Sequence, residues 1–203
     1  LCWSQTLRIW DTDTLREVAV QIDSPLWGDL QFNSDVSALV SANANVIVRL
    51  NANSELSTEE LDDSLMGYTI RFDPLEPDRL YATGSDEVII VEAGGSVDGD
   101  PLNVNTEGGV HFTLDSKATK LALGGPGIVR VIHLEGGELL HEMPVEGRVF
   151  EIIFSPEGDQ VLFTIVNQSL SVLWRLDIET GQVMPLLTHD LAFGSVAYGE
   201  LGN

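Results

Sequence analysis

Histidines are the residues of this chain whose type points most directly to catalysis or metal binding. They stand at His111, His133, His141 and His189. No two of them have a spacing that would bring both to one metal ion from a single strand or helical turn. His111 directly precedes Phe112 in an expected strand, so the two side chains should point to opposite faces, with His111 directed toward a neighbouring sheet or a polar pocket. The sequence therefore predicts no metal site and no cofactor.

Nucleophilic catalysis needs a Ser or Cys beside an oriented base, and the sequence offers no such pattern. No Gly-x-Ser-x-Gly turn occurs, and the single cysteine is Cys2. The glycine-rich stretch 94–103 carries two carboxylates, but Leu102 stands where a calcium loop wants a third oxygen ligand, so a simple turn is expected there. The stretch 124–127 opens no helix that could hold a phosphate and is predicted to be a hairpin turn. We therefore expect a protein that is not an enzyme.

A repeat of about 40 residues organises the chain. A phenylalanine closes a short apolar strand at intervals of 40, 40 and 42 residues, at Phe32, Phe72, Phe112 and Phe154. A polar turn follows each of them, then a second strand, then a third strand, expected at 7–10, 46–50, 88–91, 128–132 and 170–174. A repeat of this length built only of strands predicts an all-β fold, a β-propeller of four-stranded antiparallel blades. Propellers host unrelated functions, so function must be argued from a site.

The repeat pattern predicts about four complete blades, with a partial blade at each end. The expected complete blades cover 24–63, 64–106, 107–146 and 147–187, and the partial blades cover 1–23 and 188–203. Because the chain begins and ends inside a blade, we expect a fragment of a longer propeller. The alternative is a closed five-bladed ring, since five periods of about 41 residues nearly equal the 203 present. That ring would lack most of one strand in its closing blade.

The best-formed repeat, 149–181, contains Phe-Ser-Pro-Glu-Gly after its first strand and Leu-Trp-Arg in its third. It resembles the WD-repeat family, whose Trp-Asp dipeptide occurs once, as Trp10-Asp11. Kelch and other propeller families lack this ending and fit less well. In the WD-repeat family an Asp before the third strand joins a buried polar network, and here only Asp86 holds that position. The other repeats carry Asn45, Gly127 and Gln168. The resemblance therefore implies degenerate blades held more by apolar packing than by that network.

The charge balance is strongly acidic, with 32 Asp and Glu against 10 Lys and Arg and a formal net charge of −22. Such a field repels phosphate backbones, so nucleic acid is not an expected partner. The acids either recruit basic protein segments or simply solvate the surface, and their scatter over all repeats favours the second reading. The densest cluster is Glu59, Glu60, Asp62 and Asp63. It suits a basic ligand and a charged edge strand equally well.

Hydropathy and cysteine content suggest the cellular setting. No run of about 18 apolar residues occurs, so the sequence predicts a globular chain with no membrane partner. One cysteine allows no internal disulfide, which is compatible with a reducing cytoplasm. A cytoplasmic location is therefore expected, with a targeting signal before Leu1 as the alternative.

The resemblance also implies where a partner would dock: on the loops entering each first strand and the loops between second and third strands. Seven residues map to that face: Trp27, Asn45, Tyr68, Asp86, Glu87, Arg148 and Gln168. Trp, Tyr and Arg are frequent interface anchors, although Trp27 and Tyr68 would also fill gaps between blades. We therefore expect a non-catalytic scaffold for a protein or peptide partner, with no prediction of oligomeric state. The alternative is a propeller hydrolase or lyase with acids and His111 along a central channel.

Overall fold

The chain is built of antiparallel β-strands. The computed structural model describes residues 7–20, 30–41, 46–51, 55–65, 67–84, 87–92, 97–104, 111–167 and 170–190, together with Tyr198. Two compact units are present: the first is Leu1–Ala82 with Ile90–Gly99, and the second is Thr83–Ile89 with Asp100–Asn203. In the described part, no helix is long and apolar enough to cross a membrane. The all-β prediction is confirmed.

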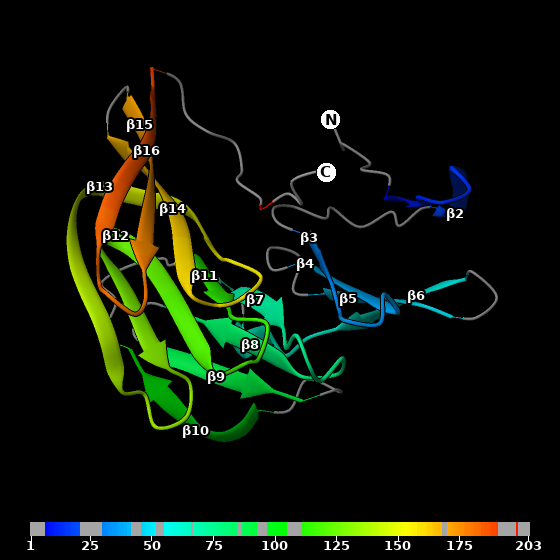
Figure 1. The fold of residues 1–203 in the computed structure, drawn as a ribbon. Helices are drawn as coiled ribbons and strands as arrows, with labels where there is room; N and C mark the ends of the chain where they lie inside the picture. The colour runs from blue at the N-terminus through cyan, green and yellow to red at the C-terminus, as the bar shows by residue number, and fades with distance from the viewer. Residues whose placement is uncertain are drawn as a thin grey trace, which may run out of the picture. The chain divides into compact units, whose positions relative to one another are not determined.

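The first unit contains a hairpin and a four-stranded sheet made of short strands (Figure 1). The hairpin pairs β1 (Arg8–Asp11) with β2 (Arg16–Val20). The sheet has the order β3 (Leu30–Phe32), β4 (Ala38–Ser41), β5 (Val46–Leu50) and β6 (Leu56–Glu60). Val40 of β4 lies opposite Ile47 of β5, and each is only 1% exposed. The apolar residues of the two central strands thus form the core of this sheet.

The acidic cluster of the sequence lies at the edge of that sheet. Glu59 and Glu60 end β6, which is an edge strand, and η2 (Asp63–Leu65), a turn of 3-10 helix, follows. Arg49 of β5 holds the Glu59 carboxylate at 3.1 Å and the Asp78 carboxylate at 2.9 Å. The placement agrees with the expected charged edge strand, which discourages pairing with another sheet.

A second four-stranded sheet has the order β10-β9-β8-β7 and includes residues of both units. Its strands are β7 (Thr69–Phe72), β8 (Leu80–Thr83), β9 (Glu87–Val91) and β10 (Val97–Asn103). All four residues of β8 are buried, as expected for an inner strand covered on both faces. Gly99 has the positive φ expected of a turn residue, +74°, but it lies inside β10.

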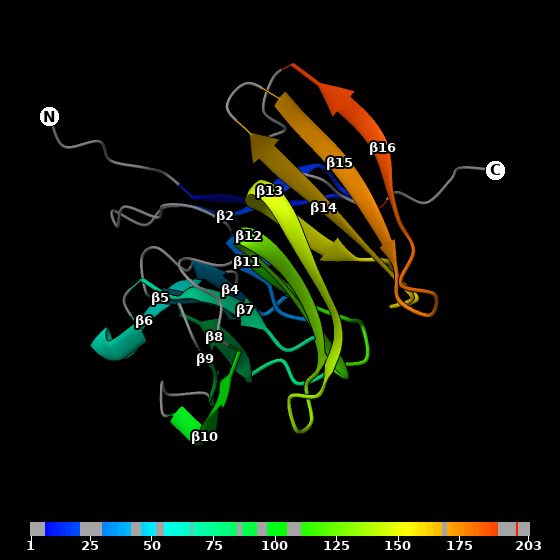
Figure 2. The ribbon, with the colours of Figure 1, turned by 90° about the vertical axis from the view of Figure 1, so that its left-hand side faces the viewer.

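The second unit contains a six-stranded sheet in which two strands are unusually long (Figures 1 and 2). The strands are β11 (His111–Leu114), β12 (Lys120–His133), β13 (Leu139–Phe154), β14 (Gln160–Asn167), β15 (Leu170–Asp177) and β16 (Val183–His189). The first part of β12 pairs with β11 and its second part with β13. The first part of β13 pairs with β12 and its second part with β14. The six strands therefore supply two four-stranded sets, joined by continuous backbone.

The predicted hairpin turn at 124–127 is wrong, because these residues lie inside β12. Gly127 has φ +77°, and the register with β13 shifts between Pro126 and Ile128. A bulge of this kind bends a strand without ending it. A Cβ placed at Gly124 would lie 2.4 Å from Cγ1 of Val149, so glycine allows β12 to run close to β13.

A buried polar residue ends the first strand of each four-stranded set. These residues are Asn33, Asp73, Asp115 and Ser155, which are 3%, 2%, 0% and 5% exposed. Their backbone N–H groups donate across the following turn to the carbonyls of Ala38, Arg79, Lys120 and Gln160, respectively. In three sets the repeated phenylalanine directly precedes the polar residue. In the fourth set Leu114 directly precedes Asp115, and Phe112 lies two positions before Leu114. The sequence repeat is therefore misaligned in that set.

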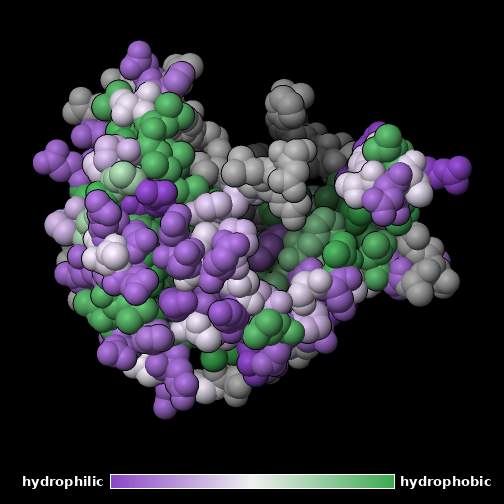
Figure 3. Space-filling view, viewed as in Figure 1, coloured by the Kyte–Doolittle hydropathy of each residue, from purple (hydrophilic) through white to green (hydrophobic). Residues whose placement is uncertain are grey.

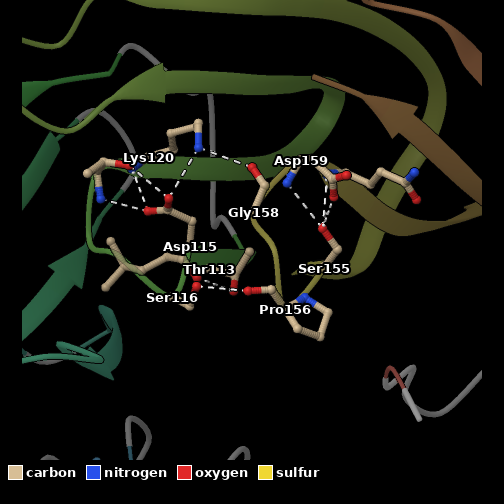
Figure 4. A network of polar contacts seen from close by, with 11 residues as sticks. Thr113, Asp115, Ser116, Lys120, Ser155, Pro156, Gly158 and Asp159 are labelled. Atoms are coloured by element: carbon tan, nitrogen blue, oxygen red, sulfur yellow. Dashed lines mark hydrogen bonds and ion pairs between the residues drawn. The ribbon is translucent and has the colours of Figure 1, made fainter. Parts of the chain in front are cut away.

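Asp115 has the largest set of side-chain partners among the four (Figure 4). Its carboxylate accepts hydrogen bonds from the Thr119 N–H at 2.6 Å, the Thr119 hydroxyl at 2.8 Å and the Lys120 N–H at 2.7 Å, and pairs with Lys120 Nζ at 3.2 Å. Burial alone would raise the pKa of Asp115, but the hydrogen bonds from Lys120 and Thr119 hold it below 3.8. The charged form is thus the one that stabilises this turn.

Two of these turns are also tied to the turn of the next set within the same unit. The Ser116 hydroxyl donates to the carbonyl of Pro156 at 2.8 Å, and Lys120 Nζ donates to the carbonyl of Gly158 at 3.1 Å (Figure 4). In the first unit, Asn33 Nδ2 donates to the carbonyl of Pro77 at 3.1 Å. Polar contacts therefore join consecutive sets, in addition to the apolar packing that the sequence predicts.

Replacing Asp115 by Ala should lower the free energy of unfolding by about 3 kcal/mol, because several buried donors lose their acceptor together. Urea unfolding followed by circular dichroism measures the change. The matched control is Glu135→Gln, at an exposed site with no buried partner, which should change stability by less than about 0.5 kcal/mol. Equal stability of the two variants would contradict the role assigned to Asp115.

The contribution of Asp115 should depend on pH. Its folded-state pKa lies below the ordinary 3.8, so its stabilisation is present above 3.8 and is lost as the pH falls through the folded-state value. The stability difference between the wild type and Asp115→Asn should therefore shrink as the pH is lowered from 6 toward about 3. Urea titrations of both proteins at several pH values measure it. A difference that stays constant over this range would contradict the assignment.

Candidate functional site

Four of the seven residues predicted to face a partner lie outside the described residues: Trp27, Asn45, Asp86 and Gln168. Of the others, Tyr68 belongs to the first unit, where it is half-buried and its N–H donates to the carbonyl of Leu65 at 3.0 Å. Glu87 is half-buried at the start of β9. Arg148 is exposed on β13 in the second unit. Arg148 is therefore the predicted residue that leads to a describable site.

Arg148 stands where β13 passes from one four-stranded set to the next. It lies opposite Pro126 of β12 on one side and Val166 of β14 on the other. The preceding residue, Gly147, has φ +131°, a conformation that is essentially restricted to glycine. A Cβ at Gly147 would lie 2.8 Å from the carbonyl oxygen of Val166. Glycine thus lets β13 cross close to β14 at this point.

An apolar groove of about 340 Å³ lies beside this crossing, between β13 on one side and β14 and β15 on the other. Its first wall consists of Met143, Pro144, Val145 and Glu146. Its second wall consists of Ile165, Asn167, Leu170, Val172 and Trp174. Arg148 is close in sequence to the first wall and pairs with Val166, which stands between Ile165 and Asn167. The groove therefore adjoins the predicted partner-binding face.

The second wall follows from strand periodicity. Leu170, Val172 and Trp174 alternate along β15, so their side chains share one face. Val172 lies opposite Ile165, and Trp174 lies opposite Phe163, which is fully buried. Leu170 is 41% exposed at the other end of the row. The wall thus runs from the half-buried Trp174 at one end to the exposed Leu170 at the other.

The ionisable side chain of the lining is that of Glu146, which is exposed at the rim. Glu142 lies four residues earlier on the same face of β13, where its carboxylate accepts a hydrogen bond from Arg130 Nε at 2.9 Å. Arg130 also donates to the carbonyl of Val104 at 2.6 Å, so its guanidinium group is bound within the protein and is not part of the groove lining. The rim of the groove is therefore acidic, and its interior is apolar.

Further hydrophobic side chains are exposed near the outer strands of the same unit. Figure 3 shows them gathered at the upper left, over β15 and β16. Leu186 and Leu187 of β16 are 46% and 50% exposed. They do not line the groove and provide matched positions for comparison with Leu170.

A second apolar groove, of about 490 Å³, lies in the first unit between the β1–β2 hairpin and β3 with its following turn. Trp10 and Phe32 line it and are 54% and 40% exposed. The single Trp-Asp dipeptide of the chain therefore points its tryptophan toward solvent and not into a buried polar network. Arg8, Asp11 and Asp13 also line this groove.

The histidines occupy structural positions. The His111 ring stacks on Phe150 of β13, with ring centroids 6.3 Å apart and an interplanar angle of 18°. Phe150 lies in the part of β13 that pairs with β14, so His111 faces the next four-stranded set of the same sheet. His141 Nε2 lies 2.7 Å from the carbonyl oxygen of Ile178. Within the described ranges, no group of three His, Cys, Asp or Glu side chains could hold a metal ion.

Comparisons with known proteins give the fold and no family. No family model matches the chain, and no curated protein does. A functionally unknown protein from Desulfotomaculum acetoxidans DSM 771 aligns with 93% of this chain at a TM-score of 0.66 and 14% identity. A chain of the mitotic checkpoint complex aligns with 95% at a TM-score of 0.67 and 16% identity. The fold is β-propeller-like.

This chain spans 65% and 61% of the lengths of those two solved chains. At such low identity the likeness concerns the fold alone. The groove beside Arg148 therefore has to be judged from its own residues.

Sequence reasoning reached Arg148 but missed the groove itself. Met143, Val145 and Trp174 lie in segments that read as ordinary strands. The one available signal was the alternation of large apolar residues at 170, 172 and 174, which marks a common face. It does not show whether that face is covered, because coverage depends on how far apart two neighbouring sets lie.

Replacing Gly147 by Ala should lower the free energy of unfolding by about 3 kcal/mol, because Ala strains φ at this position and its Cβ meets the backbone of Val166. The matched control is Gly127→Ala, where φ is also positive but nothing lies within 4 Å of the new Cβ. That variant should cost about 1 kcal/mol. Urea unfolding compares the two, and a smaller cost at Gly147 than at Gly127 would contradict the close crossing.

Proposed function

We propose that this chain is a WD-repeat-like β-propeller segment that acts as a non-catalytic scaffold and binds a protein or peptide partner. Four sets of four strands support about four complete blades: β3–β6, β7–β10 and the two sets joined within β11–β16. The β1–β2 hairpin would belong to a further blade. The partner would bind on the face that carries the crossing at Arg148 and the adjoining end of the groove at Leu170.

The observation that supports this function is the apolar groove between β13 and β14–β15. A cavity of about 340 Å³ lies at the lower end of the range of ligand-binding clefts and suits one or two side chains of a partner. Large aromatic side chains in such clefts contribute strongly to binding when a partner covers them, and aliphatic side chains add buried apolar area. Trp174 and Leu170 line the groove, and the exposed Arg148 belongs to the adjoining crossing of β13, outside the lining.

The catalytic alternative receives no comparable support. It would need His111 close to several carboxylates; the contact that supports a structural role instead is the stacking of its ring on Phe150. A scaffold needs only a shaped apolar surface and a polar rim, and the groove has both.

A random peptide library displayed on phage, selected on the immobilised chain, tests the proposed function. Groove-dependent peptides should lose at least about tenfold in affinity for the variant Leu170→Asp, because a carboxylate replaces an apolar contact of the second wall. The matched control is Leu187→Asp, on β16 outside the groove and similarly exposed. It should leave binding unchanged.

Circular dichroism and urea unfolding of both variants establish that they fold like the wild type. The proposal fails if the selected peptides bind wild type and Leu170→Asp equally, or if the library yields no binder at all.

A further inference from the structure

The shape of the groove selects an extended segment. Met143 to Glu146 are four consecutive residues of one strand, so the first wall is roughly 10 Å long. The second wall follows β15 through Leu170, Val172 and Trp174, which again gives a straight row. A straight groove between two strand-built walls fits a peptide backbone in β conformation better than a compact fold or a helix, whose diameter is about 10 Å or more.

The interior of the groove selects an apolar anchor. Met143, Val145, Ile165, Val172 and Trp174 supply its inner surface, and none of them carries a charge. An ionised side chain entering this interior would lose its water without gaining a partner. The anchor is therefore an aliphatic or aromatic side chain.

The rim selects the charge of the residues that flank the anchor. Glu146 is the ionisable group of the lining, and Glu142, the next carboxylate along the same face of β13, keeps 46% side-chain exposure despite its pairing with Arg130. Arg148 stands beyond the bend at Gly147 and is not part of the lining. The net charge of −22 adds a long-range field that attracts cations and repels acidic peptides.

We infer that the groove between β13 and β14–β15 takes an extended peptide segment in which an apolar anchor is flanked by Lys or Arg. This inference rests on the proposed function and names the class of partner. The anchor lies between Val145 and Trp174, and a basic side chain of the partner meets the Glu146 carboxylate at the rim.

Two matched synthetic peptides test the inference. One has a Leu-Ser-Ile core flanked by lysines, and the other has the same core flanked by glutamates. Both carry a fluorophore, and their binding to the full chain is followed by fluorescence anisotropy at low and at physiological salt. The lysine peptide should bind at least about tenfold more tightly, with the difference reduced at higher salt.

Charge reversal separates the rim from the long-range field. Glu146→Lys and the control Glu157→Lys change the net charge equally, but Glu157 lies in the turn at the opposite end of β14, which is about 23 Å long. Glu146→Lys should weaken the lysine peptide several-fold more than Glu157→Lys does. Equal weakening by the two variants would overturn the role of the rim.

The remaining outcomes distinguish this inference from the proposed function. If both peptides bind equally and both are lost in Leu170→Asp, the groove binds peptides without a preference for basic flanks, and only the inference fails. If the glutamate peptide binds more tightly, the inference is reversed. If neither peptide binds and the display library also yields nothing sensitive to Leu170→Asp, both fail.

Discussion

The structure depends on one buried polar residue that closes the first turn of each four-stranded set. Asn33, Asp73, Asp115 and Ser155 occupy this position, and their environment is almost free of solvent. A polar group placed there must find partners in the protein, so the turn can adopt few conformations other than the one that supplies them. Within each unit one of these turns also donates hydrogen bonds to the turn of the next set, which restricts the spacing of those two sets at this end of the strands. Apolar packing then stabilises an arrangement of the strands that these polar contacts have already restricted.

In the second unit, long continuous strands connect these turns to the groove at the opposite end of the strands. β13 contributes to two sets, so the wall of the groove and the first strand of the next set are one piece of backbone. The crossing is possible because Gly147 adopts a φ that other residues avoid and comes close to the backbone of Val166. A side chain at this position would push β13 away from β14 and change the width of the groove. The shape of the groove is thus set by backbone chemistry and not only by the residues that line it.

The sequence predicts the strands well and their connections less well. Its repeat of apolar runs locates β5, β9 and β15 closely, because alternation and length are local properties. It fails at 124–127, where glycine and proline usually indicate a turn but here form a bulge inside β12 between Pro126 and Ile128. It also aligns Phe112 with the wrong position of its repeat. The residue that defines the register is the buried Asp115, and the sequence alone does not show which polar residue is buried. The groove was out of reach for a similar reason, since the separation of two sets is a long-range property.

The two ends of the strands in the second unit differ in their side chains: one end is stabilised by buried polar groups, and the other exposes apolar groups. At one end, Lys120 Nζ donates to the Asp115 carboxylate and the Ser155 hydroxyl donates to the Asp159 carboxylate, so the buried Asp115 and Ser155 have their partners within the protein. At the other end, β13 and β15 leave apolar side chains such as Leu170 partly open to water, which costs stability unless a partner covers them. A chain can retain such a surface only when other interactions hold the sheets in place without it. The buried polar turns supply that support, and for this reason a groove at the opposite end is compatible with a stable fold.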